Sequence, residues 1–579
     1  MFVSKNFRGC FSMPSTSMSG ARALVKALEK EGVKHTFGII GGSIMPVFDE
    51  LLESSIRHIT TRHEQGAAHA ADGYARVSGK PGVAITTSGP GATNLVTGIA
   101  NAYMDSSPIV AITGQVPTHM IGKMAFQETD IISITKPITK WNYQIRNPRE
   151  VPKAVKMAFT IATLGRPGPT LLDFPKDAQT GEDEINFDVD VSRLVTPWRP
   201  PKLDACPEEV KKAVDMILSA ERPVFIVGGG VVWSGATEEV LAIAEYLMIP
   251  IMSTFMGKGA VPENHPLYIG NLGMHGKIAA NKLLPQTDLI IAVGMRWSDR
   301  TVSEFENFAP EAKIIHIDID PKEVGKNVKV DLGIVGDAKR VLRSIYSEIT
   351  RGVKKREDWP WLKKVREFQE KYKEELIPLD GNYLRPPEIL KELRKILPED
   401  AIVATEVGQN QMWVALYFPI LKPRTFLTSG GLGTMGFGFP AAIGAKVAKP
   451  DKVVIDIAGD GSFMMSEREL ATAVNENLPV IVVILNNSSL GMVAQWQRMF
   501  FNRRYVATYF KKNPDFVKLA EAYGAQGFRA ETMEELLKAV KEGMNSEVPT
   551  VIDVPIHPED DVLPMVPPGE HISKVVTRY

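Results

Sequence analysis

Two oxygen-bearing side chains near the C-terminus have a spacing that suits a metal ion. Asp460 lies in the turn that ends Val453-Val-Ile-Asp-Ile-Ala-Gly-Asp-Gly-Ser462, and Asn487 ends the next apolar run, 27 positions later (487 − 460). Both are expected at the carboxyl edge of a parallel sheet, where ligands bind in open α/β folds. One carboxylate and one neutral amide suit Mg²⁺, a cation that prefers oxygen and often bridges to phosphates.

The turn around Asp460 is also suited to a phosphate group. Gly459 and Gly461 let the backbone approach a diphosphate closely, and the start of the following helix, with Ser462, favours an anion. A lone Gly-Asp-Gly usually marks only a turn, but with Asn-Asn at this distance it resembles the signature of thiamine-diphosphate enzymes. This resemblance implies that thiamine diphosphate and Mg²⁺ bind here, with the backbone carbonyl of Ser489 as a further metal ligand.

A second candidate for chemistry is Glu64, which opens a helix rich in alanine and glycine. A carboxylate in front of so many small residues is expected to be partly desolvated, which favours a role in sharing a proton. The structural alternative is a glutamate that the helix dipole favours at a helix N-terminus. The resemblance assigns Glu64 to the aminopyrimidine ring, whose tautomer such a glutamate controls. In that family the domains of Glu64 and Asp460 come from different subunits, which implies at least a homodimer.

Apolar β-branched runs alternate with helical patterns along almost the whole chain, which predicts parallel α/β units. At 579 residues the chain is too long for one hydrophobic core. Polar stretches at 181–207 and 351–373, the second read as a helical connector, separate the units. We predict three doubly wound parallel-sheet domains at 18–185, 205–350 and 384–570. Residues 1–17 are read as a leader that is disordered, transit-like, or upstream of an alternative start at Met18.

The first and last of these domains repeat the same order of features. A small-residue stretch at 66–75 precedes a strand and the turn at 88–91, and a stretch at 436–445 precedes a strand and the turn at 458–461. The next strand opens at Pro108, 17 residues after Gly91 (108 − 91), and at Pro479, 18 after Gly461 (479 − 461). A common βα rhythm explains the order but less well the matched offsets. We therefore predict two related thiamine-diphosphate-binding domains that flank a Rossmann-like middle domain.

Composition excludes several classes of protein. The 67 basic and 68 acidic residues give a net charge of −1, so charge offers no argument for binding nucleic acid or an anionic membrane. Two cysteines exclude a disulfide framework and a cysteine-based metal site, and they fit a reducing, cytoplasmic location. No apolar run reaches the length of a membrane span.

The middle domain has features suited to a nucleotide. A strand enters a glycine turn at 222–230, acids close a later strand, and arginines suit a pyrophosphate. The alternative is a domain that kept the fold and lost the nucleotide. These segments are similar to the FAD-binding region of anabolic acetolactate synthases. The similarity places flavin contacts at Gly228, Gly229, His275, Gly294, Arg296, Asp318 and Asp337.

Motifs spread over residues 18–569 resemble the catalytic subunits of acetolactate synthases. They include Arg62-His-Glu-Gln-Gly-Ala-Ala-His, Thr87-Ser-Gly-Pro-Gly-Ala-Thr-Asn, Leu490-Gly-Met-Val-Ala-Gln-Trp-Gln and Leu563-Pro-Met-Val-Pro-Pro-Gly. The resemblance implies decarboxylation of pyruvate on thiamine diphosphate and transfer of the hydroxyethyl unit to pyruvate or 2-oxobutyrate, in branched-chain amino acid biosynthesis. The cofactor supplies the electron sink, and the protein orients the 2-oxo acids in a water-poor pocket. A homodimer or homotetramer is implied, and the family commonly has a small regulatory subunit.

The same resemblance assigns further site residues. Gln127 would contact the reacting groups, Lys176 belongs to the catalytic set, and Trp496 would discriminate between acceptor substrates. For Trp496 the structural alternative is a buried aromatic that follows the metal loop. The thiamine contacts are assigned to Gly408, Gln409, Asn410, Met412, Gly433 and Met435, the last of which would brace the bent cofactor.

Some positions depart from the family pattern. Asn410 stands for a histidine, Ile40 for a proline, Lys123-Met124 for Thr-Asp, Trp141 for a histidine and Ser298 for an aspartate. These departures leave thiamine dependence untouched and concern the acceptor and the carboligation step. The alternative activities are therefore a related thiamine-diphosphate 2-oxo acid decarboxylase or a pyruvate oxidase, and the alternative class is a non-catalytic paralogue that binds the cofactor.

Overall fold

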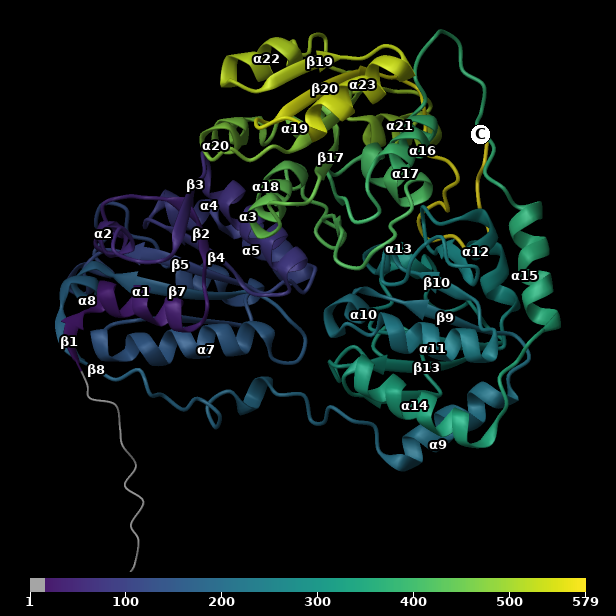
Figure 1. Cartoon of the computed structure of the whole chain (residues 1–579), viewed down its shortest axis with the longest axis horizontal. Coiled ribbons are helices and arrows are strands. Elements are labelled where there is room, and N and C mark those ends of the chain that lie inside the picture. Colours follow the sequence, from purple (N-terminus) through teal and green to yellow (C-terminus); the bar gives the residue numbers. More distant parts are fainter. Residues whose placement is uncertain (1–15, 579) are drawn as a thin grey trace, which may run out of the picture. The chain divides into compact units, whose positions relative to one another are not determined.

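The computed structural model describes residues 16–578, which form two compact units (Figure 1). The first unit runs to Ala71 and resumes at Pro81–Arg199, and the second comprises Asp72–Lys80 and the chain from Pro200 onward. Residues 1–15 of the predicted leader lie outside the described residues. The last two residues of that leader belong to strand β1 (Thr16–Ser19), which pairs antiparallel with β8 (Glu182–Ile185).

The first unit is built on a parallel sheet with the strand order β3-β2-β4-β5-β7-β6. Strands β4 and β5 are buried along their whole length, as expected for a parallel sheet covered on both faces. Helices α1 and α7 lie side by side on one face, where their apolar residues join one core with the strands (Figure 1). The strands are β2 (His35–Ile39), β3 (Arg57–Thr60), β4 (Gly82–Thr86), β5 (Ile109–Gln115), β6 (Trp141–Gln144) and β7 (Thr170–Pro175), and the helices are α1 (Gly20–Lys30), α2 (Met45–Leu51), α3 (Glu64–Ser78), α4 (Pro90–Asn94), α5 (Val96–Met104), α6 (Ile131–Thr135), α7 (Val151–Thr163) and α8 (Lys176–Thr180). The residues of α3 from Asp72 onward belong to the second unit.

A second parallel sheet has the order β11-β10-β9-β12-β13-β14. Renumbered by position along the chain, this is 3-2-1-4-5-6, the strand order of the Rossmann fold. The predicted Rossmann-like middle domain is confirmed, and α15 is the helix expected in the charged connector. The strands are β9 (Pro223–Val227), β10 (Ile251–Ser253), β11 (Tyr268–Asn271), β12 (Leu289–Val293), β13 (Lys313–Asp318) and β14 (Leu332–Val335), and the helices are α9 (Pro207–Ser219), α10 (Gly229–Ser234), α11 (Thr237–Leu247), α12 (Ile278–Leu283), α13 (Asp299–Val302), α14 (Ala338–Gly352) and α15 (Pro360–Lys371).

The third parallel sheet has the order β16-β15-β17-β18-β20-β19. Renumbered in the same way, the first and third sheets are both 2-1-3-4-6-5, so the predicted relationship between the outer domains is confirmed. The ends of the three predicted domains stay predictions. The strands are β15 (Ile402–Thr405), β16 (Phe426–Leu427), β17 (Val454–Gly459), β18 (Ile481–Asn486), β19 (Gln526–Arg529) and β20 (Thr550–Pro555), and the helices are α16 (Pro386–Ile396), α17 (Gln409–Tyr417), α18 (Gly438–Ala448), α19 (Asp460–Phe463), α20 (Leu470–Asn475), α21 (Gly491–Phe500), α22 (Phe516–Tyr523) and α23 (Met533–Met544).

Short 3-10 helices complete the connections between these elements. Several carry a proline at their start, where the missing N–H is not needed for an intrahelical bond. They are η1 (Thr118–Met120), η2 (Lys136–Ile138), η3 (Pro148–Glu150), η4 (Thr196–Trp198), η5 (Phe255–Gly257), η6 (Leu284–Gln286) and η7 (Glu467–Glu469).

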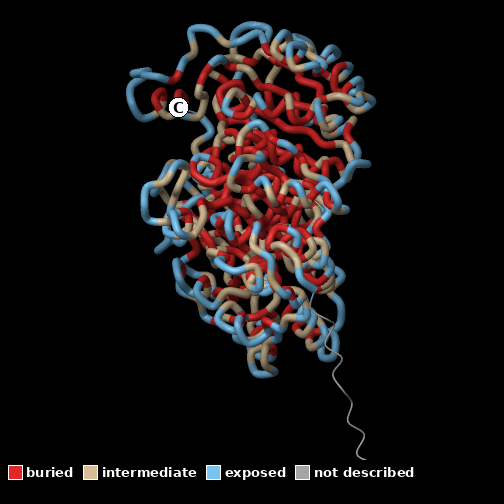
Figure 2. Tube along the Cα trace, turned by 90° about the vertical axis from the view of Figure 1, so that its left-hand side faces the viewer, coloured by how far each residue is buried: buried red, intermediate tan, exposed pale blue. Residues whose placement is uncertain are grey.

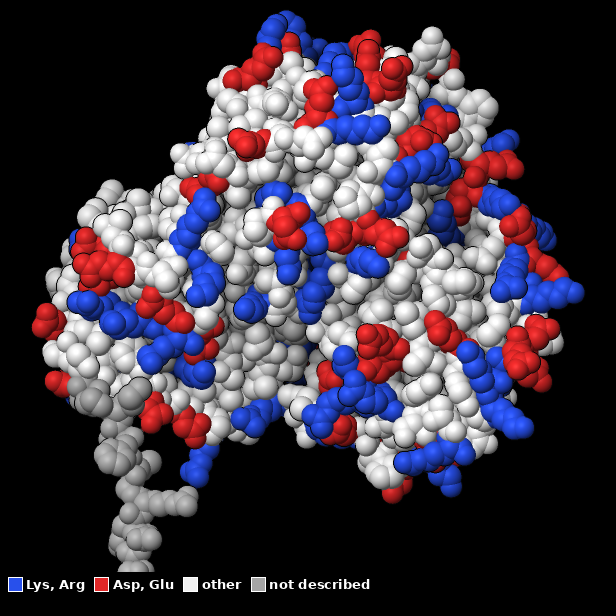
Figure 3. Space-filling view, in the orientation of Figure 1, with Lys and Arg blue, Asp and Glu red and all other residues white. Residues whose placement is uncertain are grey.

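Burial follows the strands, and charge is spread over the surface. Figure 2 shows buried residues concentrated along the sheets, with exposed residues in the connections. On the face shown in Figure 3, basic and acidic side chains are interspersed. Among the described residues, no helix combines the length and the apolar character that a membrane crossing requires.

A buried carboxyl group stands at the carboxyl edge of the first sheet. Asp173 in β7 accepts hydrogen bonds from Thr113 Oγ1 (2.8 Å), Gln144 Nε2 (2.8 Å) and Gln115 Nε2 (3.2 Å). Burial raises the pKa of Asp173 to about 6, although these three donors act in the opposite direction. The folded state therefore holds a proton on this carboxyl at a pH where the unfolded chain has lost it.

We predict that Asp173 makes the first unit less stable as the pH rises from about 4 to about 6, with no further effect above that range. The shift from 3.8 to about 6 corresponds to about 3 kcal/mol. Asp173→Asn keeps an acceptor for both glutamines and removes the titration, so its thermal unfolding midpoint should rise relative to the wild type at neutral pH. Asp188→Asn, at an exposed position, is the control. Parallel pH profiles for wild type and Asp173→Asn would contradict the prediction.

Candidate active site

The two predicted metal ligands lie at adjacent strand ends. Strands β17 and β18 are parallel neighbours, with Gly459 opposite Leu485, so Asp460 and Asn487 follow two neighbouring strands at the same edge. Both side chains are buried. The structure therefore brings together the carboxylate and the amide that the spacing in the sequence indicated.

The carboxylate of Asp460 has one oxygen without a partner. Oδ2 accepts a hydrogen bond from Asn513 Nδ2 (2.7 Å), whereas Oδ1 is buried and has no hydrogen-bond partner among the described residues. Burial raises the pKa of Asp460 to about 6, although the bond from Asn513 acts in the opposite direction. A buried carboxylate oxygen of this kind needs a donor or a cation. Mg²⁺ fits this donor set because it binds through one or two carboxylates and keeps positions for phosphate and water.

The amide of Asn487 is held on both sides. Its Nδ2 donates to Gln409 Oε1 (2.9 Å), and its Oδ1 accepts from the backbone N–H (3.2 Å) and the hydroxyl (2.9 Å) of Ser489. Within residues 16–578, no group of three or more His, Cys, Asp or Glu side chains is arranged for a metal. A site of one carboxylate, one amide and a backbone carbonyl is the kind that the sequence predicts here.

The turn after β17 is tight and carries two glycines. Ser462 Oγ donates to Gly459 O (3.1 Å), which keeps the turn tight where α19 begins. A Cβ at Gly461 would lie 2.8 Å from the Leu490 side chain, so a larger residue would require Leu490 to shift. Asn410 lies beside Gly459, and its Nδ2 donates to the backbone carbonyls of Glu406 (2.9 Å) and Ile457 (2.8 Å).

The other predicted thiamine contacts lie on two connections of the third domain. Gly408 is the residue before α17 and has a φ of 152°, and Met412 is half-buried one turn into that helix. Gly433 has a φ of 72° in the loop before α18, where Met435 is half-buried. Their contact with a cofactor stays a prediction.

Two buried carboxyl groups next to this turn were not predicted from the sequence. Glu406 accepts from the backbone N–H groups of Gly436 (2.7 Å) and Phe439 (3.1 Å), at the start of α18. Asp456 lies close to it in β17, and burial raises the pKa of both carboxyls. The pair therefore holds at least one proton near neutral pH. A single acid inside an apolar strand gives no signal that would have identified it.

Glu64 opens α3 as predicted and is buried. Its Oε2 accepts a hydrogen bond from Asn94 Nδ2 (2.9 Å), and a Cβ at Gly91 would lie 3.4 Å from its Oε1. Asn94 and Gly91 both belong to the turn and helix that follow β4. The expected desolvation of Glu64 is therefore present, and the glycine gives a flat ligand room beside the carboxylate.

Gln127 reaches the same turn from the loop after β5. Its φ is 61°, and a Cβ at Gly89 would lie 2.9 Å from Gln127 Cα. The structure thus brings Glu64 and Gln127 to opposite ends of the turn at residues 89–91. Lys176 is exposed at the first position of α8, directly after β7 and at the same edge of the sheet. Glu64 and Gln127 belong to the first unit, and Asp460 and Asn487 to the second.

Trp496 is half-buried on α21, with its ring edge-to-face with Phe500 at 6.3 Å between centroids. Its indole N–H is buried and has no acceptor among the described residues. A buried tryptophan usually finds a partner for this group. The free donor fits a position that meets a ligand better than a position inside an apolar core.

Five of the seven predicted flavin residues lie at three adjacent strand ends of the middle sheet, β9, β12 and β13, whereas His275 follows β11 and Asp337 follows β14 at the outer strands. Gly228 and Gly294 pack backbone against backbone, so closely that a Cβ at Gly228 would collide with Gly294 O. Gly229 begins α10, Arg296 follows β12, and Asp318 ends β13. Asp337 caps α14 by accepting from Arg340 N (3.0 Å), which gives it a structural role that the sequence prediction did not include.

His275 lacks any partner within this group. Both of its ring nitrogens are buried without a hydrogen-bond partner among the described residues. Burial lowers the pKa of His275 to about 3, with a further contribution from the charge of Arg300, so the ring is neutral. A neutral imidazole with two unsatisfied nitrogens fits a contact with a heterocyclic cofactor.

Comparison with known proteins agrees with this geometry. The chain matches three family descriptions in order: thiamine pyrophosphate enzyme, N-terminal TPP binding domain (residues 18–134), central domain (210–345) and C-terminal TPP binding domain (406–554). It is 50% identical over 566 residues to a probable acetolactate synthase large subunit of Methanocaldococcus jannaschii, covering 96% of this chain and 95% of the relative.

Two further relatives carry the same name. The acetolactate synthase large subunit of Corynebacterium glutamicum is 44% identical over 565 residues, covering 96% of this chain and 90% of that protein. That of Cyanidium caldarium is 43% identical over 573 residues, covering 96% of each. With three thiamine pyrophosphate enzyme domains and this likeness along nearly its whole length, the chain belongs to the thiamine-diphosphate-dependent acetolactate synthase large-subunit family.

Proposed function

We propose that this chain decarboxylates pyruvate and transfers the two-carbon unit to a second 2-oxo acid, as an acetolactate synthase catalytic subunit. The observation that carries the proposal is the unpartnered Oδ1 of Asp460 beside Asn487, in the domain that matches the C-terminal thiamine domain. The relatives are named acetolactate synthases, which disfavours the alternative of a plain decarboxylase or oxidase. Pyruvate and 2-oxobutyrate are the acceptors we propose.

Bound thiamine diphosphate would supply the carbon nucleophile and the electron sink for loss of CO₂. Asp460, Asn487 and the Ser489 carbonyl would hold Mg²⁺, and the turn at residues 459–462 would receive the diphosphate. Glu64 would share a proton with the aminopyrimidine ring. Gln127 and Lys176 would bind the 2-oxo acids, and Trp496 would select the acceptor with its face and its free N–H.

The remaining thiamine contacts follow the same arrangement. Gly408, Gln409, Asn410, Met412, Gly433 and Met435 would contact the pyrimidine and the diphosphate. FAD would bind at the carboxyl edge of the middle sheet, on Gly228, Gly229, His275, Gly294, Arg296, Asp318 and Asp337. The two unsatisfied nitrogens of His275 support this assignment.

We further propose a homodimer or a homotetramer of such dimers. Glu64 and the Asp460 site lie in different units, and Met124 and Phe126 beside Gln127 are 95% and 88% exposed in the single chain. Apolar side chains this exposed are typical of an interface. Because the relatives are named large subunits, we propose that a small regulatory subunit also binds. A cytoplasmic location fits the two cysteines.

The activity is tested by product analysis. Purified protein with thiamine diphosphate, Mg²⁺ and pyruvate should form acetolactate, and added 2-oxobutyrate should divert product to acetohydroxybutyrate. Free acetaldehyde as the main product would indicate a decarboxylase, and acetate with peroxide an oxidase. Either result would overturn the proposed carboligation while leaving the thiamine site intact.

Glu64→Gln should lower kcat by at least about 100-fold, because an amide cannot exchange a proton with the cofactor ring. The amide keeps an acceptor for Asn94, so fold and thermal midpoint should change little. Glu53→Gln, an exposed position in the same unit, is the control. Near-normal turnover of Glu64→Gln, with product identity checked, would rule out this role.

The flavin assignment predicts that the purified protein is yellow and that FAD can be released and counted. His275→Leu should weaken FAD affinity by about tenfold, because each contact with a buried polar group is worth about 1.4 kcal/mol. His265→Leu, a histidine paired with Glu245 in the same domain, is the control. Absence of FAD from the wild type after incubation with excess cofactor would contradict the assignment.

A further inference from the structure

A buried row of hydrogen-bonded side-chain amides connects the proposed metal ligand Asn487 to the C-terminal segment at residues 560–562. Its members are Asn487, Gln409 and Gln495, each of which is at most 6% exposed. Gln409 was predicted to be a thiamine contact, and Gln495 was assigned no role. The inference drawn from these three amides rests on the Mg²⁺ site of the proposed function.

The orientation of the amides is fixed at the end farthest from the metal. Val562 N–H donates to Gln495 Oε1 (2.9 Å), and Gln495 Nε2 donates to Val562 O (3.0 Å). Oxygen and nitrogen of a side-chain amide are otherwise easily exchanged, but the backbone N–H and C=O of Val562 have fixed identities. Gln495 therefore has only one orientation that satisfies both bonds.

This orientation is transmitted to the metal ligand. Gln409 Nε2 donates to Gln495 Oε1 (3.0 Å) and to the backbone carbonyl of Asp560 (3.1 Å), and both of these are acceptors. Gln409 must therefore present its oxygen to Asn487, whose Nδ2 donates to it (2.9 Å). The only remaining polar atom of the Asn487 amide is Oδ1, which is turned toward Ser489 and away from Gln409.

A glycine makes room for this contact. Gly491 is the first residue of α21, and a Cβ at this position would collide with Gln409 Oε1 and lie 2.5 Å from Asn487 Nδ2. Any larger residue would push the two amides apart. The hydrogen bond between Gln409 and Asn487 therefore depends on a glycine at the first position of α21.

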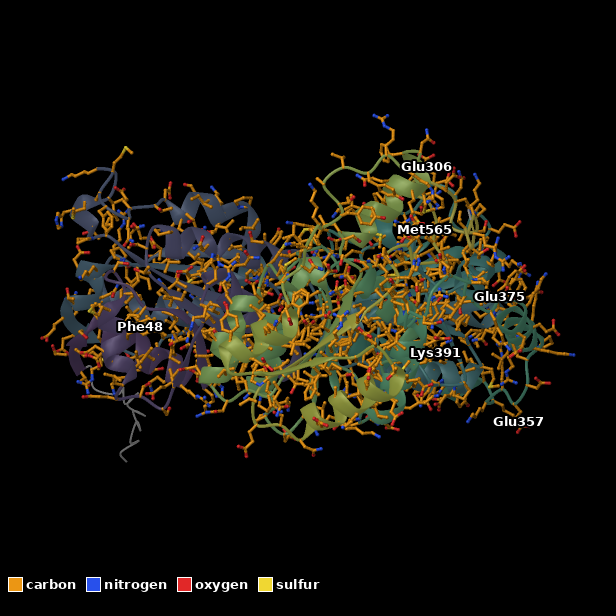
Figure 4. The ribbon with its side chains drawn as sticks, turned by 90° about the horizontal axis from the view of Figure 1, so that it is seen from above. Phe48, Glu306, Glu357, Glu375, Lys391 and Met565 are labelled. Atoms are coloured by element: carbon orange, nitrogen blue, oxygen red, sulfur yellow. The ribbon has the colours of Figure 1, made fainter. Side chains whose placement is uncertain are left out.

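The C-terminal segment that Gln495 contacts is held firmly in place. Arg385 holds Asp560 through two hydrogen bonds (2.6 and 3.0 Å), and Arg498 pairs with Asp561. Tyr417 donates to Leu563 O (2.9 Å), and Met565, labelled in Figure 4, is fully buried with its sulfur 3.8 Å from Gln495 Nε2. Bidentate pairs of this kind fix position as well as distance. The backbone at Val562 is therefore a rigid reference for Gln495.

We propose that Gln495 is a positioning residue for the metal site, because it relays the orientation of the Val562 backbone through Gln409 to Asn487. The relay keeps the Asn487 oxygen available for Mg²⁺ and prevents the amide from turning its NH₂ group toward the cation. Gln495 itself does not touch the metal.

The test measures metal binding and not turnover. Mn²⁺ replaces Mg²⁺, and its dissociation constant is measured by electron paramagnetic resonance on the full-length protein with saturating thiamine diphosphate. Gln495→Met fills the volume and removes the relay, and it should weaken Mn²⁺ binding by about 10- to 100-fold. Gln497→Met is the matched control, since Gln497 is a buried glutamine of the same helix that bonds Val506 O and Thr508 instead. It should bind Mn²⁺ like the wild type.

Gly491→Ala provides a second, independent break in the relay. It leaves Gln495 in place and blocks the contact between Gln409 and Asn487, so Mn²⁺ binding should weaken as in Gln495→Met. If Gln495→Met fails to fold, Gly491→Ala decides alone. Wild-type affinity in the folded relay variants would overturn the relay, as would equal weakening in Gln497→Met. A wild-type protein that binds no Mn²⁺ with thiamine diphosphate would instead overturn the proposed function.

Discussion

The buried carboxylate of Asp460 is the constraint around which the third domain is organised. An ionised group with one unpartnered oxygen inside a protein is strongly unfavourable unless a cation or a donor completes it. Burial raises its pKa to about 6, so the metal-free chain carries this penalty in the folded state. A divalent cation would remove the penalty and stabilise the charged form. In the proposed site, binding of metal and diphosphate would therefore stabilise this edge of the sheet.

The surroundings of Asp460 are explained by this constraint. Asn513 engages one carboxylate oxygen and so leaves the other for a ligand. Glycines stand on either side of Asp460, and parallel strand ends bring Asn487 to the same edge. Gln409 and Gln495 connect Asn487 through hydrogen bonds to the C-terminal segment at residues 560–562. Val566, shortly after that segment, donates to Met274 O (2.8 Å), next to His275. The backbone at residues 560–566 thus bonds the two glutamines behind Asn487 and the residue before His275.

The sequence predicted the parts of this structure that depend on local pattern. Apolar runs of the right length marked the central strands, and Gly-Asp-Gly with Asn-Asn put Asp460 and Asn487 at the same edge, because strand ends in a parallel sheet share one edge. Their binding of a metal stays a prediction. The sequence did not reveal the role of Gln495 or Asn513. Both are isolated polar residues whose partners lie 67 and 53 positions away, a pairing that only the folded chain creates. Likewise, the cap that Asp337 forms on α14 was not predicted, while its contact with a flavin stays a prediction.

The two thiamine domains share one strand order, yet their corresponding edges differ in chemistry. The third strand of each domain, β4 or β17, is followed by a tight turn. After β17 the turn carries Asp460, whereas after β4 it carries Gly89 and Pro90, which offer no charge to a metal. The first domain places its carboxylate, Glu64, after β3 instead, and packs it against the turn at residues 89–91. One edge is thus suited to a cation with a diphosphate and the other to a ring that exchanges a proton. In the function we propose, the cofactor carries both a diphosphate and such a ring, so the shared strand order would serve a different contact at each edge.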